Sequence, residues 1–293
     1  MSKQQEESIL STWFITGASS GLGAALARAV LSHGDRAVIT ARSRASLQEF
    51  VQDYPETALA ISLDVTDRVR VAKAVETAIK QFESIDVLVN NAGHGYRGAI
   101  EEATKEETDE VFAANFFGPV ALIQHVLPHM RQRGTGTIVN VSSIGAPVSN
   151  SGSGYYTAAK LALEGVSDAL RHEVAPLGIR IMVLEPGAFR TDFAGRSLAQ
   201  SSVVIDDYAQ TAGARRKEND HTHGTQPGDP DRAAQAILAA VQNENVPFRL
   251  LLGSDAVRVV KQDYQDRIAE IDAWTHLSQS TDYAREKNGH ALG

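Results

Sequence analysis

Short runs of apolar residues alternate along the chain with longer segments in which apolar residues recur every three or four positions. A short apolar run is typical of a strand buried on both faces, and the three-to-four spacing predicts an amphipathic helix. The predicted strands are residues 12–15, 36–40, 58–63, 85–89, 136–141, 178–184 and 248–252. The predicted helices are residues 24–31, 66–82, 105–131, 157–170, 230–241 and 254–274. This alternation predicts an α/β fold with a doubly wound parallel sheet.

The composition fits one globular domain. The chain has 293 residues, of which 43% are hydrophobic and 22% are charged. We expect a single domain over residues 1–277, followed by a polar tail over residues 278–293. Within that domain, residues 193–228 show poor periodicity and are rich in polar and small residues. A loop of this length is typically a lid or a binding segment, and we interpret it as a substrate lid loop.

Charge and residue usage exclude several classes of partner. The formal net charge is −8, so neither nucleic acid nor an anionic membrane is an expected partner. No apolar run approaches the ~20 residues that span a bilayer, and residues 1–8 do not resemble a signal peptide, so we expect a cytoplasmic protein. The chain has no cysteine, and its closest pair of histidines, His221 and His223, lacks a helical His-Glu-x-x-His arrangement. We therefore predict no metal site.

A glycine-rich turn joins the first predicted strand to the first predicted helix. Gly17 permits a tight turn, while Gly21 and Gly23 let the backbone approach a pyrophosphate at the helix N-terminus, where N–H groups and the helix dipole favour an anion. The spacing is G-x-x-x-G-x-G. Between a strand and a helix, this turn predicts the dinucleotide-binding loop of a Rossmann-type fold. The residues assigned to it are Gly17, Ser19, Ser20, Gly21, Leu22 and Gly23.

The end of the second strand bears on the choice of cofactor. Folds that bind NAD carry an acidic residue about 20 residues beyond the glycines, where it accepts from the ribose 2′-hydroxyl. Here Ala41 stands at that position, and Arg42 and Ser43 follow it. A guanidinium suits a 2′-phosphate, so NADP(H) is the predicted cofactor and NAD(H) is the alternative. A solvated arginine at the start of the next helix is the competing interpretation.

Polar and small residues follow the third and fourth strands. Asp64 and Val65 end the third strand, where a side chain can receive an adenine amino group; alternatively, Asp64 caps the next helix together with Thr66. The fourth strand ends in Asn91-Ala92-Gly93, preceded by Asn90. Small residues there allow the backbone to lie beside a flat ligand, and the amides can tie neighbouring strand ends together.

The helix predicted over residues 105–131 contains an asparagine near its middle. Asn115 lies in an apolar stretch, and an asparagine there needs a hydrogen-bond partner. Pro119 removes a backbone donor one turn later, which predicts a local kink. The sequence therefore predicts a helix that is kinked near Pro119, with free carbonyls or a water there.

Tyr156 and Lys160 are four residues apart in a segment predicted to be helical. Such residues lie on one helix face, so the ammonium can sit near the phenol. A free phenol has a pKa near ~10, and a nearby positive charge favours the phenolate. The two residues are therefore a candidate acid–base pair, although a half-buried tyrosine and a solvated lysine would show the same spacing.

Taken together, these residues resemble the short-chain dehydrogenase/reductase family, in its short single-domain branch. The resemblance covers residues 12–252, and the sequence around 185–192 and 247–255 is similar to bacterial oxidoreductases grouped with hydroxysteroid and retinol dehydrogenases. The matching positions are Thr16 to Gly23, Asp64, Asn90 to Gly93, Asn115, Ser143, Tyr156, Lys160, Pro186, Gly187 and Thr191. The resemblance implies carbonyl–alcohol interconversion by hydride transfer.

The resemblance also implies a role for each matching residue. Tyr156 would be the general acid or base, Lys160 would lower its pKa and hold the nicotinamide ribose, and Ser143 would hydrogen-bond the reacting oxygen. Asn115 would hold a water that links Lys160 to solvent. Pro186, Gly187 and Thr191 would flank the nicotinamide. Ser143 is preferred over Ser142 by its separation from Tyr156.

The substrate side is less defined. Residues of mixed aromatic and polar character border it and suit a mid-sized, partly apolar ketone, aldehyde or secondary alcohol. The candidates are His94, Tyr96, Tyr155, Phe189 and Phe193. The alternatives are an NAD-dependent alcohol dehydrogenase of the same family and a non-catalytic NADP-binding sensor. By resemblance we also expect a homodimer or homotetramer formed through the long helices around Asn115 and Tyr156.

Overall fold

A computed structural model describes residues 10–283 except residues 196 and 223. Residues 1–9 and most of the expected polar tail therefore lie outside the described residues. Seven parallel strands form the central sheet in the order β3-β2-β1-β4-β6-β7-β9. The strands are β1 (Thr12–Ile15), β2 (Arg36–Ala41), β3 (Ala58–Ser62), β4 (Val87–Asn90), β6 (Gly136–Val141), β7 (Ile179–Pro186) and β9 (Arg249–Leu252). The order steps outward in both directions from β1, which confirms the doubly wound α/β fold.

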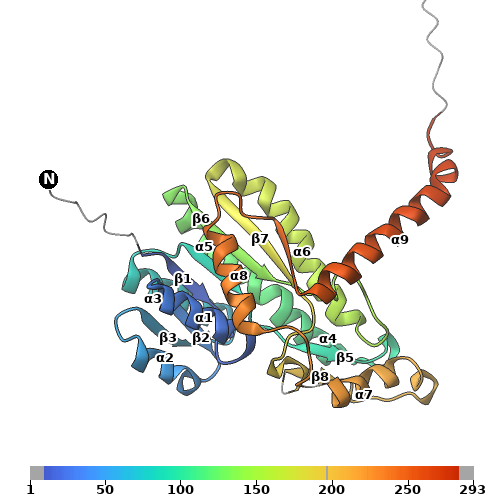
Figure 1. Cartoon of the computed structure of the whole chain (residues 1–293), viewed down its shortest axis with the longest axis horizontal. Helices are drawn as coiled ribbons and strands as arrows, with labels where there is room; N and C mark the ends of the chain where they lie inside the picture. The colour runs from blue at the N-terminus through green and yellow to red at the C-terminus, as the bar shows by residue number, and fades with distance from the viewer. Residues whose placement is uncertain (1–9, 196, 223, 284–293) are drawn as a thin grey trace, which may run out of the picture.

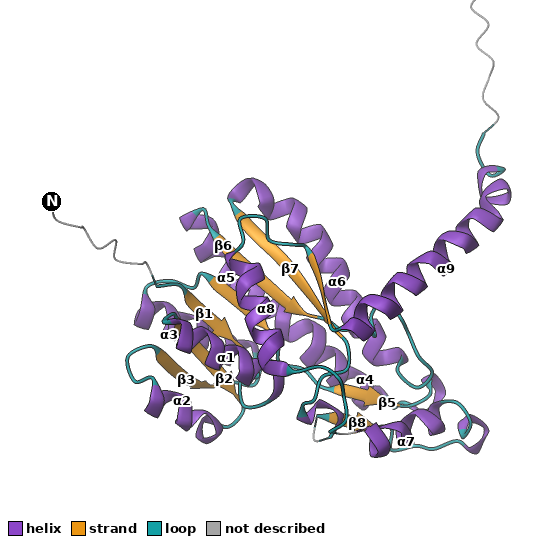
Figure 2. Ribbon diagram, viewed as in Figure 1, coloured by secondary structure: helices purple, strands orange, loops and turns teal. Residues whose placement is uncertain are grey.

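Helices cover both faces of the sheet (Figures 1 and 2). One face carries α1 (Gly21–His33), α2 (Gln48–Asp53) and α8 (Pro230–Gln242), and the other carries α3 (Arg68–Phe82), α5 (Gly118–Arg133) and α6 (Gly154–Val174). Alternate residues of a strand point to opposite faces. Accordingly, Trp13 and Ile15 enter the core beneath α1 and α8, whereas Phe14 enters the core beneath α3 and α5. Both cores are continuous along the sheet.

The helix predicted over residues 105–131 is divided. It consists of α4 (Lys105–Phe112), a π-helical turn (Ala113–Phe117) and α5. The kink was predicted at Pro119, but the observed irregularity is the π-helical turn around Asn115, which ends before Pro119. By length and composition, Lys105–Arg133 could cross a membrane, contrary to the expectation of no such run, yet α5 packs into the core against α3.

The expectation that residues 193–228 form a loop without regular secondary structure is wrong, whereas their role as a substrate lid stays a prediction. That segment contains β8 (Leu198–Gln200) and α7 (Ala212–Thr222), and β8 pairs with β5 (Gly95–Arg97) in a separate two-stranded parallel sheet. Three-residue strands are too short to show alternation, and the sequence of α7 is mostly polar, so neither element leaves a periodic signal. The predicted His221 lies in α7; its side chain and residue 223 lie outside the described part.

The last helix leaves the body. Helix α9 (Ser254–Gln279) extends five residues beyond its predicted end and projects away from the sheet (Figures 1 and 2). Ala256 and Val260, in its first two turns, are buried against the body. The remainder of the helix is largely exposed.

Candidate active site

The carboxyl ends of β1 and β4 are tied into one edge by Asn91. Its amide nitrogen donates to the carbonyls of Thr16, at 2.8 Å, and Gly17, at 3.2 Å. The Thr16 hydroxyl accepts the N–H groups of Asn91 and Ala92. The prediction that amides here join strand ends is confirmed. The glycine-rich loop is therefore held against the backbone that follows β4.

The glycine-rich loop leaves the start of α1 open to an anion. Gly17 has φ +67°, and a Cβ there would lie 2.9 Å from Ala92 Cα. A Cβ on Gly23 would lie 2.5 Å from the Gly17 carbonyl oxygen. Ser20 is the N-cap of α1 but makes no side-chain capping bond. The first-turn N–H groups thus remain available to bind a phosphate.

Arg42 and Asp64 are near one another at the ends of β2 and β3. The Arg42 carbonyl accepts the Ser62 hydroxyl at 2.8 Å. Asp64 Oδ1 accepts the backbone N–H of Thr66 at 3.0 Å and its hydroxyl at 2.8 Å. The Thr66 N–H chiefly lowers the Asp64 pKa, and the Arg42 charge contributes. Asp64 therefore stabilises the turn before α3.

The N-cap of α3 is a different residue from the one predicted. Asp67 accepts the N–H groups of Val69 and Arg70, at 3.0 and 3.1 Å. The alternative that Asp64 caps this helix is thus corrected: the helix begins at Arg68, two residues later than predicted.

Asn115 is fully buried in the π-helical turn. Its amide nitrogen donates to the carbonyls of Val111, at 2.9 Å, and His94, at 3.0 Å. Its Oδ1 has no hydrogen-bond partner among the described residues. A Cβ on Gly93 would lie 2.5 Å from that oxygen and 3.5 Å from Lys160 Nζ. Asn115 and Lys160 thus border the same space behind Gly93, and only glycine fits there.

Helix α6 carries Tyr156 and Lys160 inward, and both side chains are buried. Lys160 Nζ donates to the Val141 carbonyl at 2.9 Å and lies 5.9 Å from the centre of the Tyr156 ring. Ser143 Oγ accepts the Gly145 N–H at 3.0 Å. A Cβ on Gly145 would lie 3.2 Å from that Oγ and 3.7 Å from Tyr156 Cε1. Ser143, Tyr156 and Lys160 are thus gathered in one place.

Burial is the main influence on the pKa values of Tyr156 and Lys160. It raises the pKa of Tyr156 to about 12, against the lowering effects of the Ser143 hydroxyl and the Arg97 charge. Burial lowers the pKa of Lys160 to about 8, which the Glu164 carboxylate partly opposes. The expected lowering of the Tyr156 pKa by Lys160 is therefore wrong for this structure, because burial dominates, and the phenol is neutral. Arg97, on β5, was not among the predicted residues.

Ser142 faces away from this group, as its alternation with Ser143 requires. Its hydroxyl donates to Glu164 at 2.5 Å. Arg249 lies 3.4 Å from Glu164 and 3.2 Å from Glu185, which is almost fully buried. Burial, reinforced by the Glu164 charge and opposed by Arg249, raises the Glu185 pKa to about 7. A buried cluster of charges therefore lies behind Lys160.

The predicted substrate residues separate into two groups. Phe193 is near the chemistry, with its ring centre 6.0 Å from that of Tyr156, and a Cβ on Gly95 would lie 3.3 Å from the Phe193 ring. Tyr155 contacts Tyr96 edge-on at 6.4 Å and donates to the Ile100 carbonyl. Phe193 is thus the apolar residue that covers Tyr156.

The other candidates have structural contacts. The Tyr96 hydroxyl donates to Glu107 at 2.9 Å, and His94 Nδ1 lies 3.2 Å from the Gly95 carbonyl oxygen. Phe189 forms an isolated bridge with Gly228 and packs against the core under α1 and α8. On the cofactor side, the Gly187 N–H donates to the Leu252 carbonyl. A Cβ added to Gly21 would lie 3.3 Å from Thr191 Cβ, so Thr191 lies beside the glycine-rich loop.

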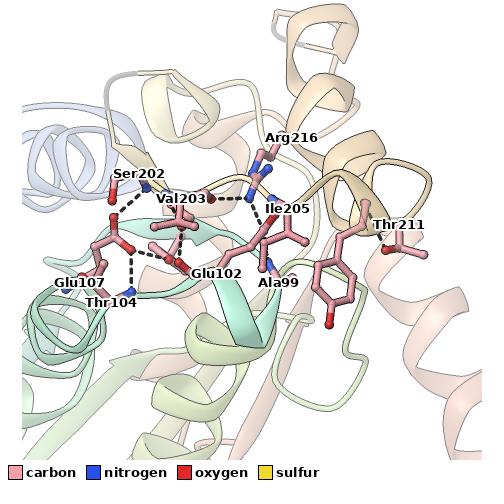
Figure 3. A network of polar contacts seen from close by, with 12 residues as sticks. Ala99, Glu102, Thr104, Glu107, Ser202, Val203, Ile205, Thr211 and Arg216 are labelled. Carbon is pink, nitrogen blue, oxygen red and sulfur yellow. Dashed lines mark hydrogen bonds and ion pairs between the residues drawn. The ribbon is translucent and has the colours of Figure 1, made fainter.

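A buried carboxylate, Glu102, and a half-buried one, Glu107, fasten the segment that follows Phe193, as Figure 3 shows. Glu102 accepts the N–H groups of Ala99, at 2.6 Å, and Ile205, at 2.9 Å, and forms an ion pair with Arg216. We call Glu102 and Arg216, with these contacts, the lid anchor. Glu102 lies about 100 residues before Ile205 and Arg216 in the sequence, so no local sequence pattern could reveal the lid anchor.

Glu107 fixes the same segment from α4. It accepts the N–H groups of Ser202, at 2.8 Å, and Thr104, at 3.1 Å. These bonds, with the Tyr96 hydroxyl, outweigh burial and lower the Glu107 pKa to about 2. Both carboxylates therefore hold residues 201–216 against the body.

The chain is similar to proteins of one family. The profile of the adh_short family, described as short chain dehydrogenase, matches residues 11–202. Oxidoreductase BOA17 of Botryotinia fuckeliana is 38% identical over 267 residues, which cover 91% of this chain and 97% of that protein. A solved short-chain dehydrogenase from Streptomyces avermitilis is 42% identical with a TM-score of 0.88, covering 94% of this chain and 100% of that one. An alcohol dehydrogenase from Thermococcus sibiricus, solved with 5-hydroxy-NADP, is 25% identical with a TM-score of 0.68, covering 83% and 96%.

Proposed function

Because the chain belongs to the short-chain dehydrogenase/reductase family, we propose that it is an NADP(H)-dependent oxidoreductase that interconverts a ketone or aldehyde with an alcohol. The observation that carries this proposal is the gathering of Ser143, Tyr156, Lys160 and Asn115 beside the nucleotide-binding edge. A buried acid, a buried cation and a hydroxyl at one place provide proton transfer to a developing alkoxide.

The residues of the edge fit a nicotinamide dinucleotide. The uncapped N-terminus of α1 suits the pyrophosphate, and Arg42 beside Asp64 suits a 2′-phosphate on the adenosine side. Asn115 Oδ1 and Lys160 Nζ border the space behind Gly93, where the hydroxyls of the nicotinamide ribose would find hydrogen-bond partners. A bound nicotinamide would supply or accept the hydride.

The chain's own residues would move the proton. In reduction, the Tyr156 hydroxyl donates its proton to the carbonyl oxygen as the carbonyl carbon is reduced, and Ser143 holds the same oxygen. Burial keeps the Tyr156 phenol protonated at neutral pH, so the proton is in place, although the raised pKa also makes the phenol a weaker acid. Lys160, protonated at neutral pH, stabilises the phenolate that results. Alcohol oxidation uses the same groups in reverse.

The substrate is proposed to be a mid-sized, partly apolar carbonyl compound or alcohol. Phe193 covers Tyr156, and Leu198 packs beside Gly95 on the same side. Apolar side chains around one proton donor favour a substrate with an apolar body. The alcohol dehydrogenase similarity is consistent with this chemistry.

A titration tests the proposal. Purified protein is titrated with NADPH and NADH by nicotinamide fluorescence, and the tighter complex is then mixed with ketones and aldehydes of increasing apolar size. We expect tighter NADPH binding and oxidation of NADPH by at least one carbonyl compound. Tighter NADH binding would contradict the NADP(H) assignment, and tight binding with no turnover would favour the sensor function.

A further inference from the structure

Helix α9 loses contact with the rest of the protein halfway along its length. Arg267 donates to the Pro147 carbonyl and pairs with Asp263 at 2.6 Å. Beyond Arg267, within the described part of the chain, the hydrogen bonds of residues 268–279 stay inside the helix and its following turn. At 1.5 Å per residue, this outer part is about 18 Å long. Figures 1 and 2 show it standing clear of the body.

An apolar stripe begins at Tyr264, just before the outer part of α9, and comprises Tyr264, Ile268, Ile271 and Trp274. These residues are 45%, 58%, 66% and 59% exposed, respectively. They continue the three-to-four spacing of Val257, which is 39% exposed, and Val260, which is buried, so the apolar face of the helix runs outward into solvent. A shallow surface groove follows it, lined by Arg267, Glu270, Ile271, Trp274, Thr275 and Ser278.

Such a stripe needs a partner. Most helix stability in proteins comes from packing an apolar face, and a short isolated helix is marginal in water. Tyrosine and tryptophan are also the residues that most often dominate protein interfaces. A helix that exposes both on one face is therefore built to be covered.

The charges on α9 disfavour a membrane as that cover. The helix carries five acidic residues and three lysines or arginines, a net of −2. Helices that lie on membranes are rich in lysine and arginine on their polar face. The whole chain is also acidic, at −8. An anionic lipid surface would repel this helix.

A second α9 complements the stripe. Tyr264 and Trp274 stand five residues on either side of Ala269, so an antiparallel pair centred there sets Tyr264 of each copy opposite Trp274 of the other. Ile268 and Ile271 then lie around the two-fold axis. Arg267 and Glu270 border the same side of the stripe, and the pairing brings each arginine alongside the glutamate of the other copy.

We propose that α9 is a dimerisation arm whose apolar stripe pairs antiparallel with α9 of a second copy of this chain. The arrangement is isologous, so the stripe of one copy packs against the same stripe of the other copy, and the dimer needs no second surface. In this register, the end of each helix lies beside the first turns of the other.

Sedimentation velocity of three variants tests the proposal. Ile271→Glu places a charge in the centre of the stripe, and Ala273→Glu places the same charge on the opposite, exposed face of the same helix. Phe117→Glu alters an exposed residue of the π-helical turn, near the helices first expected to mediate assembly. We expect Ile271→Glu to halve the mass of the wild-type particle, and Ala273→Glu to leave it unchanged.

Several outcomes would overturn the proposal. These are a monomeric wild type, an unchanged mass for Ile271→Glu, or a mass halved by Phe117→Glu but not by Ile271→Glu. Flotation with vesicles of phosphatidylcholine and phosphatidylglycerol that depends on Ile271 would also overturn it, in favour of a membrane. Unchanged NADPH binding by Ile271→Glu shows that the variant is folded.

The absence of cysteine provides a second, independent test. Ile268→Cys lies near the proposed two-fold axis, and Ala273→Cys points away from it. Under mild oxidation we expect the first variant to form a disulfide-linked dimer and the second to remain monomeric under denaturing electrophoresis. Equal cross-linking of the two variants would contradict the antiparallel pairing.

Discussion

The lid anchor makes a quantitative prediction about how the substrate side is held. Glu102→Ala removes a fully buried carboxylate that accepts two backbone N–H groups and pairs with the buried Arg216. Removing one partner of a buried ion pair costs about 3–5 kcal/mol, because the remaining charge stays desolvated. The anchor lies outside both main cores, so we expect part of this cost to appear as local release of residues 201–216.

Urea unfolding and limited proteolysis measure these two effects. Glu106→Ala, at an exposed position of α4, is the control and should change the free energy of unfolding by no more than about 0.5 kcal/mol. Glu102→Ala should be cleaved faster between β8 and α7 and should show a higher KM for the carbonyl substrate with unchanged NADPH binding. A loss of less than about 1 kcal/mol, with unchanged proteolysis, would refute the reasoning.

Three further predictions concern the cofactor edge and the buried charges. Arg42→Asp should reverse the cofactor preference from NADPH to NADH, measured by fluorescence titration; a variant that still strongly prefers NADPH would show that Arg42 is a solvated arginine. Gly23→Ala should cost about 1–3 kcal/mol and weaken cofactor binding, because its Cβ meets the Gly17 carbonyl, whereas Gly165→Ala, with open space around it, should not destabilise the protein in thermal unfolding. Burial raises the Glu185 pKa from 4.5 to about 7, so the folded state holds a proton that the unfolded state releases, and stability should fall as pH rises across that range. Glu185→Gln should flatten this pH dependence in urea unfolding, and an unchanged slope would exclude Glu185 as its source.

The sheet and the nucleotide-binding edge were predictable because their signals are local. Each strand is a short apolar run, and the residues after β1, β4 and β6 follow directly in the sequence. Parallel strands bring their carboxyl ends to one edge, so Gly17, Asn91 and Ser143 had to lie near one another. Tyr156 and Lys160 were predictable because helical spacing fixes their common face.

The remaining features depend on contacts between distant segments. The β5–β8 sheet joins residues about 100 positions apart, and its strands are too short for a pattern. Arg97 belongs to β5 of that sheet, and its charge acts on Tyr156. Glu102 and Arg216 pair although they are far apart in the sequence. The amphipathic pattern of α9 was visible in the sequence, but its spacing does not reveal that the outer half lacks cover.

The most direct measurement of the central claim compares two adjacent tyrosines. Tyr156→Phe removes the proposed proton donor and keeps the ring, while Tyr155→Phe removes a hydroxyl that bonds to the Ile100 carbonyl. NADPH binding and carbonyl-dependent NADPH oxidation are measured for both variants and the wild type. We predict that Tyr156→Phe abolishes turnover with NADPH binding nearly intact, and that Tyr155→Phe retains both. Equal losses of turnover in the two variants would contradict the assignment of Tyr156 as the acid–base residue.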